Sequence, residues 1–470
     1  MQRSQAPEHH PRQQIVVPSR SDRLLRSMTE PVGGPLGKRT APGGTNPGFF
    51  TVERVLVLMA AASAIIAVMG KFHCRQTGWN TPDQYSTVCW SQFPNTFVEN
   101  NLAAYFPYFG EGGTFAHPPL AGIIAGVTAW LTAGAGTGAP RSLAYFDLNA
   151  ALLAVVWIIT VVLVARSSGR RPWDAALVAA SPLLILTAFV SWELWAAGLV
   201  SLGLYFFARY RTLWAGVSIG LAAMVSPYAL VVLFVLLVLG VRSGQLTKML
   251  ELTAAGLVAM MLVLAPAMLA NAGAVRDFLG AQLTNPASDS SIFGGYNLIA
   301  ARMKLPVMAD PTVNVLSAFL LGVLLLGIVW LALYAPRQPR VAALAFVAVA
   351  GVLVVGKTTE PWQAVWLVPL LALAMPRWRP ALLWQAGIMV HFIALMLFES
   401  KVLGKLSDQH AIDTPYFVLA ALLGGLGTCA MIGLVIRDMW HPEHDVVRRG
   451  GVDDPQGGVL LAREVPAAHG

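Results

Sequence analysis

The sequence predicts an all-α protein, a polytopic transmembrane bundle of about 12–13 helical spans. Hydrophobic residues make up 56% of the 470 residues, only 12% are charged, and the mean hydropathy is +0.62. Soluble domains carry about 25% charged residues, so this composition excludes a soluble fold. The apolar residues form continuous runs of about 17–25 residues, which is the length of a transmembrane helix. A membrane β-barrel would instead show alternating segments of ~10 residues.

The N-terminal segment, residues 1–50, is rich in Pro, Gly, Arg and Gln and has no periodicity. This composition predicts a disordered tail. A basic cluster directly before the first apolar run places the tail in the cytoplasm, because cytoplasmic segments collect Lys and Arg. Its members are Arg20, Arg23, Arg26, Lys38 and Arg39.

The membrane domain is predicted over residues 51–437, followed by a disordered C-terminal tail over 438–470. Two polar segments, 71–117 and 271–311, are predicted as outer loops because basic connectors mark the opposite side. Apolar runs begin and end at about 53–70, 119–134, 144–166, 173–190, 192–209, 213–226, 227–241, 248–270, 312–334, 341–356, 360–376, 380–399 and 415–437.

One conflict follows from this count. If the runs 119–134 and 144–166 both cross fully, Arg166, Arg170 and Arg171 come to lie outside. Two explanations stay open: one short run does not cross fully, or the positive-inside rule fails at this connector.

The first outer loop contains Cys74 and Cys89 among many aromatic residues. Two alternatives stand for this pair, a disulfide or two free thiols. An extracytoplasmic loop would favour the disulfide. Closing a loop of about 15 residues would stabilise the fold by roughly 3 kcal/mol.

Several function classes have no support in the sequence. The net charge is +8, and the basic residues are scattered along the chain, as expected for cytoplasmic connectors. This pattern gives no reason to expect a nucleic-acid partner. A P-loop, a dinucleotide-binding glycine motif and metal-spaced His or Cys clusters are all missing from the sequence. We therefore expect no metal and no cofactor.

Ionisable residues near the predicted span ends are the candidate functional residues, because such groups are costly in lipid. Each also has a structural alternative. Asp83 suits a turn, His117 could anchor the next span, Glu193 could lie in the headgroup zone, and Lys357 and Glu360 could form a surface ion pair. The ionisable candidates are Asp83, His117, Glu193, Arg302, Lys357 and Glu360, and Trp192 stands beside Glu193 as a further candidate.

Several sequence motifs between about residues 70 and 400 occur in the same order as in a known protein family. The first outer loop ends in TFAHPPLAG, and RRPWDAALVAASPLLILTAFVSWELWAAGL, LWAGVSIGLAAMVSPYALVVL and KTTEPWQAVWLVPLLALAMPRWRPALLWQA follow in order. The chain thereby resembles glycosyltransferase family 87 of the GT-C fold, the actinobacterial polyprenyl-phosphate-mannose-dependent mannosyltransferases and their relatives. The resemblance implies a GT-C-like bundle in the plasma membrane.

The resemblance also implies a reaction. A sugar, of mannose type, would move from a polyprenyl-phosphate donor to an envelope glycan or glycolipid on the outer face. A carboxylate in the first outer loop would act as general base on the acceptor hydroxyl. Basic residues would stabilise the phosphate leaving group.

This sequence departs from the family pattern at three functional positions. Gln92 stands where relatives have an aspartate. The segment that contains Val225 has no lysine, whereas the matching segment of relatives has one. The family tyrosine before Pro-Pro is His117, whereas Glu193 keeps the carboxylate of the Asn-Trp-Asp turn.

We therefore expect Asp83, Glu193 and His117 in catalysis, and Lys357, Arg302, Glu360 and Trp192 in substrate or phosphate binding. The alternatives are a catalytically inactive envelope scaffold or lipid-binding protein and, third, a secondary transporter. Transporters often show internal repeats and broken helices. The segments near Pro182 and Pro227 are broken, but no repeat accompanies them.

Overall fold

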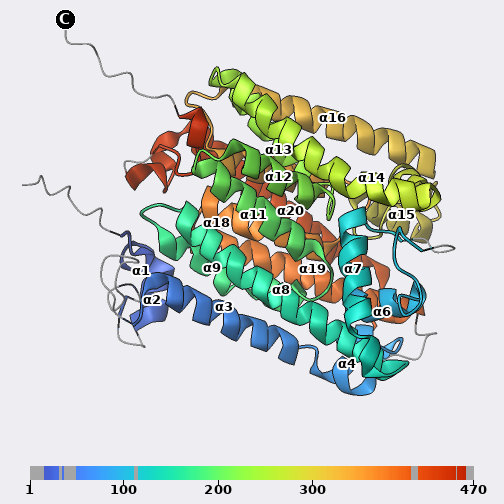
Figure 1. Ribbon diagram of the computed structural model, residues 1–470. Coiled ribbons are helices and arrows are strands. Elements are labelled where there is room, and N and C mark those ends of the chain that lie inside the picture. The colour runs from blue at the N-terminus through green and yellow to red at the C-terminus, as the bar shows by residue number, and fades with distance from the viewer. Residues whose placement is uncertain are drawn as a thin grey trace, which may run out of the picture.

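Six helices are long and apolar enough to cross a membrane in the part of the chain that the structure describes. The structure is a computed structural model that describes residues 15–30, 34–35, 37, 49–110, 115–403, 411–450 and 453–461 (Figure 1). The six long helices are α3 (Val52–Met69), α8 (Ala139–Ser167), α14 (Leu246–Thr284), α16 (Asp310–Tyr334), α19 (Trp378–Leu403) and α20 (Thr414–Trp440). The all-α prediction is confirmed.

Shorter helices occupy the remaining apolar runs. They are α7 (Pro119–Leu131), η4 (Pro172–Ala175), α9 (Ala176–Ala179), α10 (Pro182–Thr187), α11 (Glu193–Ala208), α12 (Thr212–Ala223), α13 (Ala229–Arg242), α17 (Val341–Val355), η5 (Pro361–Trp366) and α18 (Leu367–Ala374). Polar segments supply α1 (Pro18–Ser21), α2 (Arg23–Thr29), α4 (Phe72–Thr77), α5 (Asp83–Ser86), α6 (Gln92–Glu99), η3 (Ala133–Ala135), α15 (Ile292–Arg302), η6 (Pro442–His444), η7 (Arg448–Gly450) and η8 (Gly458–Leu460).

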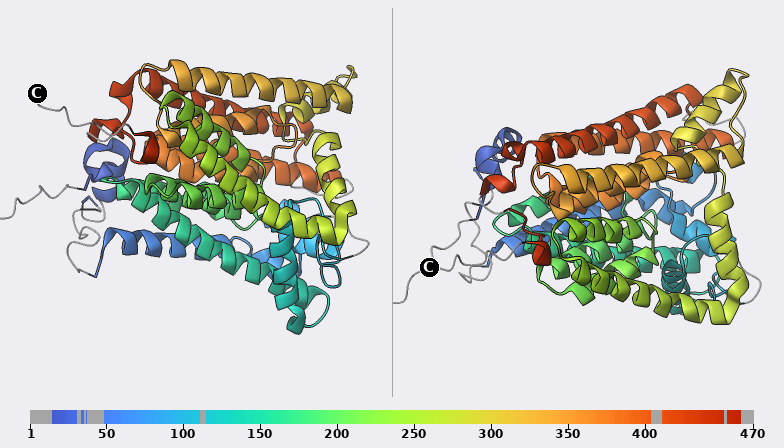
Figure 2. Two further views of the ribbon diagram at one scale, coloured as in Figure 1. Left: turned by 45° about the horizontal axis from the view of Figure 1, so that its top comes forward. Right: turned by 90° about the horizontal axis from the view of Figure 1, so that it is seen from above.

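The bundle has two distinct ends (Figures 1 and 2). Helices α1 and α2 and the C-terminal segment lie at one end, which we call the inner end. Helices α4, α6, α7 and α15 lie at the other, the outer end. Both predicted loops are therefore on the same side. The basic connectors gather at the inner end, which identifies it as cytoplasmic by the positive-inside rule.

Helix α7 explains the conflict over Arg166. With 13 residues, α7 is about 20 Å long and stands at the outer end, whereas the 29 residues of α8 extend about 43 Å from the outer to the inner end (Figure 1). The Arg166 guanidinium pairs with the Glu53 carboxylate at the start of α3, at 2.9 Å. Arg166 thus lies inside, and the short run is the one that does not cross.

Three helical hairpins enter from the inner end and return to it. The first joins α10 to α11, the second α12 to α13, and the third α17 to η5 and α18. Glycines allow the second hairpin to pack closely on α14. A Cβ at Gly216 would lie 2.0 Å from the Leu252 carbonyl oxygen, and one at Gly220 would lie 2.2 Å from that of Gly256. Small residues permit such backbone contact between membrane helices.

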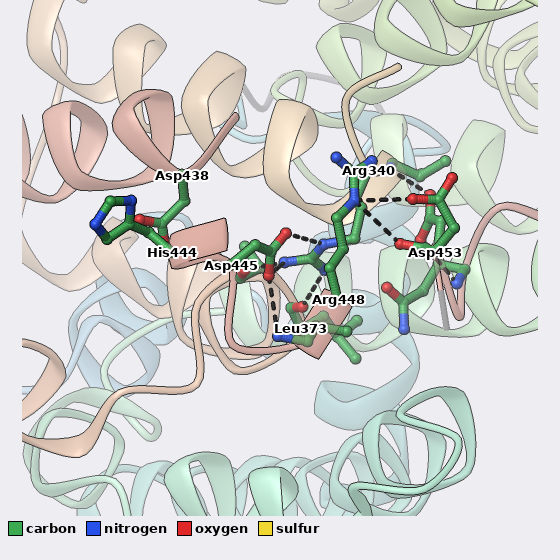
Figure 3. Close-up of polar contacts among 12 residues, drawn as sticks. Arg340, Leu373, Asp438, His444, Asp445, Arg448 and Asp453 are labelled. Atoms are coloured by element: carbon green, nitrogen blue, oxygen red, sulfur yellow. Dashed lines mark hydrogen bonds and ion pairs between the residues drawn. The ribbon is translucent and has the colours of Figure 1, made fainter. Parts of the chain in front are cut away.

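The C-terminal segment was expected to be disordered over 438–470, but its described part is ordered against the inner end (Figure 3). The buried Arg340 guanidinium pairs with the Asp445 carboxylate, with Nε 2.7 Å from Oδ2. The Val341 amide donates to Asp454 at 2.9 Å, and Gln456 donates to the Ser167 carbonyl at 2.7 Å. Burial of these ionic and polar contacts is the physical reason for the difference.

The N-terminal tail also contains structure where a disordered segment was expected. In α2, Asp22 accepts hydrogen bonds from the backbone amides of Leu24 and Leu25 at 2.9 and 3.1 Å, as an N-cap does. The Val16 amide donates to the Arg170 carbonyl at 2.8 Å, which fixes this segment to the connector after α8. Residues 1–14 and 38–48 lie outside the described residues.

Candidate functional site

The turns of the three hairpins come together beneath the outer end. Helices α11, α12, α13 and α17 have 12–16 residues, or about 18–24 Å, against a hydrocarbon core of about 30 Å. The turns at residues 191–193, 226–228 and 356–360 are therefore recessed relative to the ends of the long helices. Each turn carries polar side chains at the end of an apolar helix.

Outer segments cover all three turns through backbone hydrogen bonds. The first loop, the start of α7 and the second loop each contribute one. The donor and acceptor pairs are Gln92 N to Val190 O at 2.8 Å, Leu120 N to Met224 O at 2.9 Å, and Ser288 N to Lys357 O at 2.8 Å. Both outer loops are thus fixed to the recessed turns, and we call this covered region the turn site.

Glu193, in the first turn, is a carboxylate at which the second turn and η5 of the third hairpin meet. Its Oε2 atom accepts a hydrogen bond from the Trp366 indole N–H at 2.7 Å. The Ser226 and Gln363 side chains lie beside the same carboxyl group. Tyr228 stacks on Trp366 with 4.0 Å between ring centroids. Residues from the first turn, the second turn and η5 therefore surround one partly buried carboxylate.

Glu360 lies at the other end of η5, outside the helical spans. The Gln363 side chain accepts from the Glu360 amide at 2.9 Å, and together they form a capping box. Burial raises the pKa of Glu360 to about 8, with smaller contributions from Glu399 and Asp289, while the Ser290 and Ser288 hydroxyls oppose the shift. Glu360 is therefore mostly protonated at neutral pH.

His117 and Gln92 form a neutral pair above the first turn. The Gln92 Nε2 atom lies 2.9 Å from His117 Nε2. Burial lowers the pKa of His117 to about 4, so the imidazole is neutral at pH 7. With the amide nitrogen donating, His117 Nε2 accepts and the proton is on Nδ1. The imidazole packs on the Trp192 indole with 5.1 Å between ring centroids. His117 thus lies against Trp192, the residue before Glu193, and the catalytic and binding roles of these residues stay predictions.

Asp83 lies apart from this group. Its carboxylate is 2.8 Å from His73 Nε2 and 3.4 Å from the Thr77 hydroxyl, and its side chain is 44% exposed. These contacts belong to the surface of the first loop. Asp83 as general base stays a prediction that the structure's contacts do not support.

Lys357 and Arg302 already have protein partners. The Lys357 ammonium donates to the carbonyl oxygens of Leu283 and Asn285 at 2.9 and 2.8 Å and to the Asn314 side chain at 2.6 Å. These bonds use all three of its donors. The Arg302 guanidinium pairs with Asp413 at 2.8 Å. Lys357 therefore orders the third turn, and phosphate binding by either cation would require these bonds to break.

Cys74 and Cys89 form a disulfide bond in the first loop, across 15 residues of sequence. The second loop is shorter than the predicted 271–311, because α14 continues to Thr284 after a non-helical residue at Asn271. The Asn271 side chain donates to the Gly110 carbonyl at 2.9 Å and so links the two loops.

Sequence reasoning missed four members of the turn site, namely Ser226, Tyr228, Gln363 and Trp366. All are uncharged, so a search for ionisable groups passes over them. One signal was present for two of them: Ser226 and Tyr228 stand between two apolar runs that are each shorter than a full span. Polar residues at the ends of short runs are candidates for recessed turns.

A protein-family model matches the central part of the chain, from the end of the first loop to the end of α17. The family model described as glycosyltransferase family 87 matches residues 115–356. The chain belongs to this family. The match includes the first two turns and ends where the third begins, so His117, Trp192, Glu193, Ser226 and Tyr228 all lie within it.

Other comparisons add a structural likeness. The chain is similar to the crystal structure of ArnT from Cupriavidus metallidurans bound to undecaprenyl phosphate, with a TM-score of 0.43 and 15% identity, over 83% of this chain and 78% of that chain. No curated protein matches the sequence. The family and the six long apolar helices together make this a multi-pass membrane protein of the glycosyltransferase class.

Proposed function

We propose that this protein transfers a sugar from a polyprenyl-phosphate donor to an acceptor hydroxyl at the outer face of the plasma membrane. The observation that carries the proposal is the meeting of the first turn, the second turn and η5 of the third hairpin around Glu193, beneath loops at the outer end. Family membership supports the reaction class. A mannose-type sugar and an envelope glycan or glycolipid acceptor are the specific substrates that we propose.

In the proposed step, the Glu193 carboxylate takes the proton of the acceptor hydroxyl. The acceptor oxygen then bonds to the anomeric carbon as the bond from that carbon to the phosphate oxygen breaks. Polyprenyl phosphate leaves with the electron pair of that bond. A base must lie within hydrogen-bond reach of the hydroxyl, and the Trp366 indole would hold the carboxylate in that position.

Glu360 is the weaker candidate for the base, although it is also a carboxylate at the turn site. Its side chain forms the capping box with Gln363 at the start of η5, whereas the Glu193 carboxylate accepts from Trp366 where the second turn and η5 meet. We assign it a positioning role through the capping box with Gln363.

The test is sugar transfer by purified protein in lipid vesicles, with polyprenyl-phosphate mannose as donor. Glu193→Gln should lower the rate by about 10²–10⁴-fold, the usual contribution of a general base. Glu251→Gln is the matched control, because Glu251 is at the inner end, away from the turn site, and pairs with Lys248 at 2.9 Å. Wild-type activity in Glu193→Gln would overturn the assignment.

A non-catalytic envelope role is the second candidate, and one observation favours it. Gln92 stands at the position of the acid in relatives, and its amide is hydrogen-bonded to neutral His117. A protein of this kind would show no donor-dependent transfer in the same assay, while its Glu193→Gln variant would still perform the cellular role.

A further inference from the structure

A cleft of about 830 Å³ lies at the outer end, beside the turn site. Its walls come from the end of α4, from α6 and from the start of α8, which lie at one corner of the bundle (Figure 1). The volume falls in the range of about 300–1,000 Å³ that is typical of sites for small ligands. None of the residues assigned to sugar transfer lines this cleft.

Four amide side chains dominate the polar part of the lining: Gln76, Asn80, Asn95 and Asn101. An amide offers both donors and an acceptor, and so does each hydroxyl of a sugar. Trp79 and Val98 add apolar surface, which suits the C–H face of a sugar ring. The Trp79 indole N–H is buried and has no hydrogen-bond partner among the described residues. Burying these amides against a lipid chain would leave them unpaired, at a cost of free energy.

The charge of the lining disfavours strongly acidic ligands. Arg75 and Glu99 are the only charged residues among the described residues that line the cleft. The Arg75 guanidinium is held by the Asp147 carboxylate through two hydrogen bonds of 2.9 and 2.8 Å. Its charge is therefore already compensated, and a phosphate or a uronic acid would find no free cation on this wall.

Covalent and ionic links hold the walls of the cleft in place without a ligand. The Cys74–Cys89 disulfide fixes α4 to the loop before α6, and the Arg75–Asp147 pair fixes α4 to α8. The Asn80 amide nitrogen donates to the Thr77 carbonyl at 2.9 Å. Such preorganisation lowers the entropy cost of binding.

Helix α6 connects the cleft to the turn site. Gln92 at its start contacts His117, whereas Asn95 and Glu99 further along line the cleft. We propose that this cleft binds a neutral oligosaccharide, the glycan part of the acceptor. This inference rests on the proposed function for its role in transfer, but the binding itself can be measured without it.

The experiment measures binding of neutral mannose and glucose oligosaccharides to the full chain in lipid nanodiscs, by saturation-transfer NMR and titration. The double variant Asn95→Ala, Asn101→Ala should weaken the Kd at least tenfold, because two hydrogen-bonding amides are lost. Gln245→Ala is the matched control, an exposed amide at the inner end whose Kd should equal that of the wild type.

An acidic oligosaccharide of uronic acids forms the second arm and should not bind. An unchanged Kd in the double variant, absence of binding to the wild type, or preference for the acidic probe would overturn the proposal. Glu193→Gln should bind the neutral probe as the wild type does. A Glu193→Gln variant that still transfers sugar would therefore refute only the proposed function, whereas intact binding in the double variant would refute only the cleft.

Discussion

Two glutamates of the turn site have the same side chain and different surroundings. Glu193 accepts a hydrogen bond from Trp366 and lies beside Ser226, whereas the buried Oε2 atom of Glu360 has no hydrogen-bond partner among the described residues. The sequence identified both as candidates because ionisable residues near span ends are costly. It could not separate their roles, since their partners come from turns far apart in the chain.

Glu360 should make the stability of the folded protein depend on pH. Its pKa rises from 4.5 to about 8, mainly through burial, so the folded chain holds this proton more tightly than the unfolded chain. Between those two values the folded state binds more protons, and the free energy of unfolding falls as pH rises. The contribution of the Glu360 proton to the free energy of unfolding is fully present below about pH 4.5 and is lost as the pH rises through about 8.

Thermal unfolding of wild type and Glu360→Gln, followed across this pH range in detergent, measures the effect. We expect the wild-type midpoint to fall with pH relative to that of the variant, which cannot titrate at this position. Parallel midpoints for the two proteins across the whole range would show that Glu360 has an ordinary pKa.

At the scale of elements, the lengths of the apolar runs predicted the helices but not how the short helices pack against one another and against α14. The runs at 192–209, 213–226 and 227–241 were predicted as separate spans, and each is a helix of 12–16 residues. The packing of the second hairpin on α14 depends on glycine contacts such as Gly216 on Leu252. Such contacts join residues distant in sequence, so periodicity alone does not report them.

The first outer loop should depend on its disulfide. Replacing Cys74 and Cys89 by serine removes a link across 15 residues, which should destabilise the loop by roughly 3 kcal/mol. Limited proteolysis should then cut within residues 71–117 faster than in the wild type. Cys429→Ser serves as control because Cys429 is the free cysteine of the described residues. Equal cleavage rates would mean that the loop is held by its other contacts.

At the scale of the whole molecule, the structure settles the sidedness that the sequence left open. Arg166 pairs with Glu53 at the inner end because α8 is long and α7 is short. Arg166 therefore lies with the other basic connectors, and both described ends of the chain lie on one side (Figure 2). The sequence could not decide this, since α7 is apolar enough to resemble a span.

This sidedness can be tested with single cysteines and a thiol reagent that does not cross membranes. A cysteine at Asn101 should react in intact cells, and one at Gln245 only after the membrane is permeabilised. The reverse pattern, or reaction of both in intact cells, would contradict the orientation.

The C-terminal segment should stabilise the entire bundle from the inner end. Asp445→Asn leaves the buried Arg340 charge without its ionic partner (Figure 3), and breaking a buried pair in this way costs about 3–5 kcal/mol. The thermal midpoint in detergent should fall clearly, whereas Glu443→Gln, at a side chain 65% exposed, should leave it unchanged. Equal midpoints for both variants would show that the segment is dispensable for stability.

The central claim is that Glu193 removes the proton of the acceptor hydroxyl, and azide tests it most directly. Azide attacks the anomeric carbon without needing a base, so a protein that lacks only its base can still use azide as acceptor. We predict that Glu193→Gln loses transfer to the natural acceptor and forms glycosyl azide from the polyprenyl-phosphate donor. Transfer at the wild-type rate, or lost transfer without glycosyl azide, would contradict the claim.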